Sequence, residues 1–140
     1  MTITETAPTT VASAIDVAVD TLAFIKANPD EWGQASWTRC FAGHFARLDP
    51  EVTAIEQPAT CGCCDTVAVL TRTSDGTPIE SVGIWFETRL GAAAMEMVDG
   101  SNQIADLEAG VLALKDGGNV NAAVWTSRRA RLGTRGDDLL

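Results

Sequence analysis

Four cysteines and one histidine are the residues of this chain whose types and spacing could do chemistry together. Cys61 and Cys64 form a C-x-x-C pair, the spacing at which two thiolates reach one tetrahedral ion from a tight turn. Cys40 and His44 stand four residues apart, so on a helix they would lie one turn apart on the same side. The two pairs together predict a Cys3His zinc site, with Cys63 as a spare or alternate ligand. Four protein ligands leave no open position for water, so this Zn2+ would be structural.

Other interpretations of these residues stay open. Cys40 and His44 are equally compatible with ordinary core residues, with the loop cysteines incidental. Thiol–disulfide exchange needs a C-x-x-C after a strand, whereas residues 57–60 do not read as a strand and Asp65 would raise the thiol pKa. A Cys40–His44 nucleophile pair lacks an evident orienting acid. A small thiol-dependent enzyme using the Cys61–Cys64 loop is therefore an alternative, and we assign no catalytic residue.

Charge is distributed unevenly along the chain. The net charge of −9 at pH 7 argues against a protein that coats nucleic acids. Acidic residues dominate residues 16–116, whereas the last segment carries a group of arginines: Arg128, Arg129, Arg131 and Arg135. We favour a solvated terminus, and the sharper interpretation is contact with an acidic partner or with the protein's own acidic body. The arginines are the candidate partner-binding residues, and a nucleic-acid-binding module acting through them is a further alternative.

The elements that would position these residues can be read from apolar spacing. Spacings of three and four predict a helix from Val11 to Ile25, ended by Asn28–Pro29. A second helix is predicted to start at Ser36 or Thr38 and to stop at Asp49–Pro50. Residues 50–65, with Pro58 and the cysteines, are predicted to be a loop.

The second half of the chain predicts a hairpin followed by more helices. A strand at residues 67–71 should turn at 74–76 and return through Ile79. Helices are predicted from Val82 to Leu90, in a short piece through Val98, and from Ser101 to a stop at Gly117–Gly118; residues 120–125 fit a strand or a helix.

These elements predict a mainly α fold of the α+β class: a compact bundle of about four helices with a small β-hairpin. We expect a disordered leader at residues 1–10, one globular domain at 11–126 and a basic, polar tail at 127–140. No apolar run is long enough for a bilayer and no secretory signal is present, so a cytoplasmic protein without a membrane partner is expected.

Two stretches resemble a group of small uncharacterised proteins of actinobacteria and their phages. The first runs from Ile25 through Asn28-Pro29-Asp30-Glu31-Trp32 to Trp37, followed by Cys40-Phe41-Ala42-Gly43-His44. The second contains Leu90-Gly91, then Met97-Val98-Asp99-Gly100-Ser101-Asn102-Gln103-Ile104-Ala105-Asp106-Leu107, then Val111 and Leu114. The resemblance implies a bacterial or phage origin and a compact helical fold, and it implies no activity.

The chain departs from that group at its cysteines. Members of the group often carry an additional cysteine just before the Cys-Phe-Ala-Gly motif, whereas this chain has three in the later loop instead. A metal site would therefore be peculiar to this branch. Our leading hypothesis is a non-enzymatic binding or regulatory module that acts on another protein, on a host factor if the gene belongs to a phage.

Overall fold

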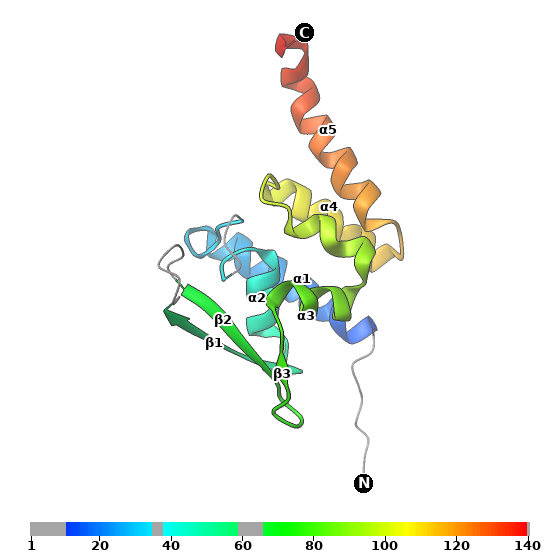
Figure 1. Cartoon of the computed structure of the whole chain (residues 1–140). Helices are drawn as coiled ribbons and strands as arrows, with labels where there is room; N and C mark the ends of the chain where they lie inside the picture. Colours follow the sequence, from blue (N-terminus) through cyan, green and yellow to red (C-terminus); the bar gives the residue numbers. More distant parts are fainter. Residues whose placement is uncertain (1–10, 35–37, 59–65, 140) are drawn as a thin grey trace.

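The computed structural model describes residues 11–34, 38–58 and 66–139, in which turns connect helices and one small antiparallel sheet (Figure 1). The mainly helical α+β class predicted from the sequence is confirmed. The helical elements are α1 (Val11–Ala27), the 3-10 helix η1 (Pro29–Glu31), α2 (Phe41–Leu48), α3 (Val82–Leu90), the 3-10 helix η2 (Ala92–Val98), α4 (Ile104–Asp116) and α5 (Val120–Leu139). The strands are β1 (Val52–Pro58), β2 (Thr66–Arg72) and β3 (Pro78–Ile79).

The core forms where α1, α2 and α3 meet, and aromatic rings fill its centre. Phe41 and Phe45 lie on α2, and both contact Phe86 of α3 edge to face, with ring centroids 5.9 and 5.3 Å apart. All three rings are fully buried. Each such pair contributes about 0.5–1.5 kcal/mol beyond the burial of its area. These ring contacts therefore join α2 to α3.

The sheet corrects one prediction. Residues 50–65 are predicted to be a loop, but Val52 to Pro58 form β1, paired antiparallel with β2 from Val52↔Arg72 to Pro58↔Thr66. The strand lies at the sheet edge, where a proline at its end removes no essential ladder hydrogen bond. The predicted hairpin is confirmed, because β3 pairs with β2 at Leu70↔Ile79.

One face of this sheet packs on the helices and the other does not. Val52 and Leu70 are buried on the inner face, whereas the opposed pair Ile55 and Val69 is 54% and 40% exposed. The sheet therefore closes one side of the core.

The second helix begins later than predicted. Ser36 lies outside the described residues, and α2 starts at Phe41 with Cys40 in extended backbone as its N-cap (φ −76°, ψ −178°). Cys40 and His44 are still joined, because the His44 amide donates to the Cys40 carbonyl at 3.1 Å.

The C-terminal helix is the longest described element. Residues 120–125 are helical, and the helix continues to Leu139 across the boundary predicted at 126/127. Twenty residues at 1.5 Å each give roughly 30 Å of helix. In Figure 1 its first turns lie beside α4, and its last turns extend beyond every other described element.

Candidate functional site

The predicted zinc ligands fall into two groups in the structure. Cys40 and His44 lie together at the start of α2, whereas Cys61, Cys63 and Cys64 lie outside the described residues. Cys40 is 2% exposed, and burial raises the pKa of its thiol. Without a metal, its environment therefore favours the thiol, which is a weaker nucleophile than the thiolate.

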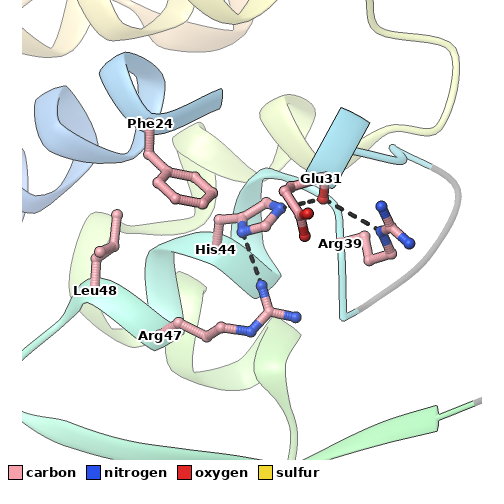
Figure 2. Close-up of a pocket in the computed structure, with 6 residues that line it drawn as sticks. All are labelled: Phe24, Glu31, Arg39, His44, Arg47 and Leu48. Carbon is pink, nitrogen blue, oxygen red and sulfur yellow. Dashed lines mark hydrogen bonds between the residues drawn. The ribbon is translucent and has the colours of Figure 1, made fainter. Parts of the chain in front are cut away.

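His44 is held through both of its ring nitrogens (Figure 2). Arg47 Nη1 lies 2.8 Å from Nδ1, and the Glu31 carbonyl oxygen lies 2.7 Å from Nε2. Because a guanidinium only donates, Nδ1 accepts and Nε2 carries the proton that it donates to Glu31. Burial lowers the pKa of His44, the hydrogen bond to Glu31 opposes this, and the positive charges of Arg47 and Arg39 lower the pKa further. His44 is therefore neutral near pH 7.

This arrangement bears on the zinc prediction without testing it. A zinc ion needs a nitrogen lone pair, and the Nδ1 lone pair here accepts the Arg47 proton. Zinc on His44 would have to displace that guanidinium or replace the contact with Glu31. With three of the cysteines outside the described residues, the Cys3His site stays a prediction.

A pocket of about 340 Å3 opens beside His44, at the meeting point of α1, η1 and α2 (Figure 2). Phe24 of α1 stacks obliquely on the imidazole, with ring centroids 5.1 Å apart. Arg39 donates from Nε to the Glu31 carbonyl at 3.2 Å and from Nη2 to the Asp30 carbonyl at 2.5 Å. The lining residues are Phe24, Glu31, Arg39, His44, Arg47 and Leu48.

The arginines of the C-terminal segment have different environments. Arg128 is 5% exposed, and its Nε and Nη2 donate to Asn102 Oδ1 at 3.0 and 2.9 Å. It also forms an ion pair with Glu96 at 3.0 Å. This candidate partner-binding residue thus binds the protein's own body.

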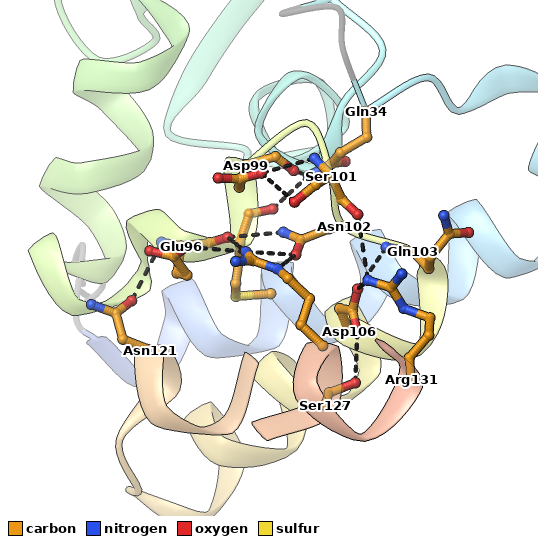
Figure 3. Close-up of polar contacts among 12 residues, drawn as sticks. Gln34, Glu96, Asp99, Ser101, Asn102, Gln103, Asp106, Asn121, Ser127 and Arg131 are labelled. Atoms are coloured by element: carbon orange, nitrogen blue, oxygen red, sulfur yellow. Dashed lines mark hydrogen bonds and ion pairs between the residues drawn. The ribbon is translucent and has the colours of Figure 1, made fainter. Parts of the chain in front are cut away.

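Arg131 does the same one turn later. Figure 3 shows Arg131 directed at Asp106 of α4, 2.5 Å from its Oδ2 atom, with Ser127 donating to Oδ1 at 2.6 Å. Asp106 is fully buried, and it also accepts from the Gln103 amide at 2.8 Å. Burial alone raises the pKa of Asp106, but these hydrogen bonds and the charge of Arg131 outweigh it and hold the pKa below its ordinary value.

The remaining two arginines differ again. Arg129 is exposed on α5, and Arg135 belongs to the same helix, although its side chain lies outside the described ones. Among the described side chains of this segment, Arg129 is thus the arginine most accessible to a phosphate backbone.

Trp125 lies on the same helix and is half exposed. Its side chain is 49% exposed, and the Arg128 guanidinium carbon lies 4.8 Å from the centre of its ring. A buried cation therefore contacts an indole that still faces solvent, a pair that was not predicted from the sequence. The i, i+3 spacing of an aromatic and an arginine on one helix was the available signal.

A buried ion pair between α2 and α3 was also missed. Arg89 donates to Asp49 in bidentate geometry, from Nε at 2.8 Å and Nη2 at 3.1 Å, and both side chains are at most 2% exposed. Trp85 Nε1 at 2.9 Å and the Glu51 amide at 3.0 Å supply further donors. Asp49 and Arg89 are forty residues apart in the sequence, so no local spacing predicts that they form a pair. Its burial on all sides indicates a structural role.

Comparison of the chain with protein-family models, curated protein sequences and solved structures finds no match. Within the described ranges, none of the helices combines the length and apolar composition that crossing a bilayer requires.

Proposed function

We propose that this protein is a non-catalytic, cytoplasmic binding module that acts on another protein through α5. The observation that carries the proposal is Trp125, which is half exposed on this helix while a buried arginine contacts its ring. Three properties of α5 support this role: its anchoring on the body, its exposed side chains and its length.

The anchor is a regular stripe along the first turns. Val120, Val124 and Arg128 recur every four residues and are at most 5% exposed. At the end of this stripe, Arg128 donates to Asn102, which precedes α4, and forms an ion pair with Glu96 of η2. Polar contacts with this geometry fix the register of the helix against the body. A binding surface carried by α5 would therefore be organised before the partner arrives, which lowers the entropic cost of association.

The exposed side of α5 has the composition of an interaction surface. Trp125 and Arg129 are four residues apart, one turn of helix, and both are exposed. Tryptophan and arginine are the residues most enriched at the energetic centres of protein interfaces. The contact with Arg128 restricts the indole while leaving half of it available. Beyond this surface the last turns of α5 extend past the other described elements (Figure 1), so a partner can reach the helix without meeting the body.

An affinity experiment with matched variants tests the proposal. The immobilised protein is exposed to an actinobacterial lysate, since the resemblance of the sequence makes a bacterial protein the first class of partner to test. We expect a partner whose affinity falls about thirtyfold on Trp125→Ala, the loss of about 2 kcal/mol typical of an interface hot spot. Ile55→Ala removes a comparably exposed apolar side chain from the sheet and should leave the partner bound.

Two results would count against the proposal. A partner that binds Trp125→Ala as well as the unaltered chain would place the interface elsewhere, provided that both proteins melt at similar temperatures. Binding to nucleic acid that weakens steeply with salt and disappears on Arg129→Glu would favour the nucleic-acid alternative. The thiol-enzyme alternative predicts instead one cysteine that is alkylated rapidly at neutral pH.

A further inference from the structure

The pocket beside His44 has an apolar side and a cationic side. Figure 2 shows Phe24 and Leu48 at one side of His44 and Arg39 at the other. Phe24 is half-buried, and Leu48 is 41% exposed although it lines the pocket. A ligand that covered Leu48 would remove apolar surface from water, which is favourable.

Arg39 is oriented by neutral oxygens. Its Nε and Nη2 donate to the carbonyls of Glu31 and Asp30, and Nη1 makes no hydrogen bond with the described residues. The same Glu31 carbonyl accepts from His44 Nε2, so one oxygen aligns both side chains (Figure 2). Carbonyl groups hold the guanidinium in place without cancelling its charge. Such a preorganised cation suits a carboxylate.

The charges of the lining residues select the sign of the ligand. Arg39 and Arg47 are cationic and Glu31 is anionic, while His44 is neutral because its Nδ1 accepts from Arg47, so the lining carries a net charge of about +1. The whole chain carries −9. The pocket is therefore positively charged although the protein as a whole is negative. A net charge of about +1 suits a ligand with one negative charge better than a phosphate dianion with two.

We infer that this pocket binds a small organic monoacid, with its carboxylate on Arg39 and its aromatic or branched aliphatic part against Phe24 and Leu48. The volume of about 340 Å3 suits a small ligand better than a large cofactor. Such a volume lies at the lower end for small-molecule pockets. The carboxylate belongs either to a free acid or to the C-terminus of a peptide that ends in an apolar residue.

Titration with matched probes tests the inference. 3-Phenylpropionate is compared with its uncharged isostere 3-phenylpropanamide at neutral pH and low salt, with the His44 ring signals as the readout, because this is the only histidine of the chain. The acid should bind at least about tenfold more tightly than the amide, and Arg39→Gln should abolish that difference.

Three further variants show whether the acid binds in this pocket or elsewhere on the protein. Leu48→Ala trims an exposed side chain, so it should fold and should weaken the acid and the amide alike. Arg129→Gln removes an arginine from α5 and should change neither affinity, and Trp125→Ala should also leave the pocket unaffected. The acid can therefore bind even if the function proposed for α5 is wrong, and the reverse also holds.

The peptide Gly-Gly-Phe, with a free or an amidated C-terminus, distinguishes the two sources of carboxylate. Stronger binding of the free peptide than of 3-phenylpropionate assigns the pocket to chain ends, and the opposite order assigns it to free acids. Equal affinity for acid and amide, undiminished acid binding by Arg39→Gln, or no shift of the His44 signals would overturn the inference.

Discussion

Replacement of Arg89 by methionine should cost the fold about 3–5 kcal/mol. Methionine keeps much of the length of the arginine stem but removes the bidentate contact with Asp49, whose side chain is fully buried. Trp85 Nε1 and the Glu51 amide would remain as donors, so the carboxylate would keep two of its four hydrogen bonds and lose its counter-charge. Removing one partner of a buried pair typically costs 3–5 kcal/mol, because the other charge stays buried and unpaired.

Urea unfolding followed by circular dichroism measures this loss. A domain stable by about 5–15 kcal/mol would still fold, with its midpoint displaced to lower urea at an unchanged slope. Arg129→Met removes an exposed arginine and should change stability by no more than about 0.5 kcal/mol. The double variant with Asp49→Asn completes a mutant cycle, in which the second substitution should cost less once the first is present. A loss below about 1 kcal/mol for Arg89→Met, or strictly additive effects, would refute the reasoning.

Three further outcomes are expected. The pKa of His44 is lowered from 6.5 in the folded state, so the unfolded chain takes up the proton first as the pH falls. The contribution of His44 to stability should therefore be full above about pH 6.5 and should be lost below it. Urea midpoints across this range should fall less in His44→Gln than in the unaltered chain. Gly110→Ala should lower the melting temperature despite the better helix propensity of alanine, because the new Cβ would lie 2.9 Å from Met97 Cγ and Sδ. Gly118→Ala is the control, because a Cβ at Gly118 makes only ordinary contacts. If the Cys3His set holds zinc, metal analysis should find about one ion per chain. Cys61→Ser or a chelator should then lower both the zinc content and the melting temperature. Purified protein without metal would refute the zinc hypothesis.

Apolar periodicity predicted the elements that pack through apolar faces. The stripe of Leu107, Val111 and Leu114 is buried in α4 as its spacing of three and four requires. The helix also ends where expected, at Gly117 in left-handed backbone (φ 73°), a conformation that glycine adopts without strain. Local information sufficed because these boundaries and faces are fixed by neighbouring residues.

The same reasoning failed where contacts between distant residues decide the structure. β1 was not anticipated because Ile55 is apolar yet faces solvent, which hides the alternation, and because its partner strand is separated from it by the cysteine segment. The length of α5 was missed because arginines, rather than a long apolar stripe, dock its middle turns on the body. A search for hydrophobic periodicity cannot detect a helix held in this way.

At the candidate sites, residue types could be recognised from the sequence, but their partners could not. A backbone hydrogen bond joins Cys40 and His44, but Cys40 caps α2 instead of lying inside it. The contacts of His44 with Glu31 and Arg47 depend on a turn that brings η1 against α2. The choice between an arginine that binds a partner and one that binds its own body depends on acids in another element. Spacing along the chain carries no information about either.

The ion pair between Arg131 and Asp106 has a consequence for biosynthesis. Asp106 is fully buried, yet the cation that it needs is translated 25 residues later. Before α5 leaves the ribosome, Asp106 lacks its Arg131 partner, so we expect α4 to pack fully against the body only after α5 has emerged. A product that terminates early, before Arg128 and Arg131, should be left with an incomplete core and become a substrate for cellular proteases. The ion pair thus makes the packing of α4 depend on a helix that is synthesised after it.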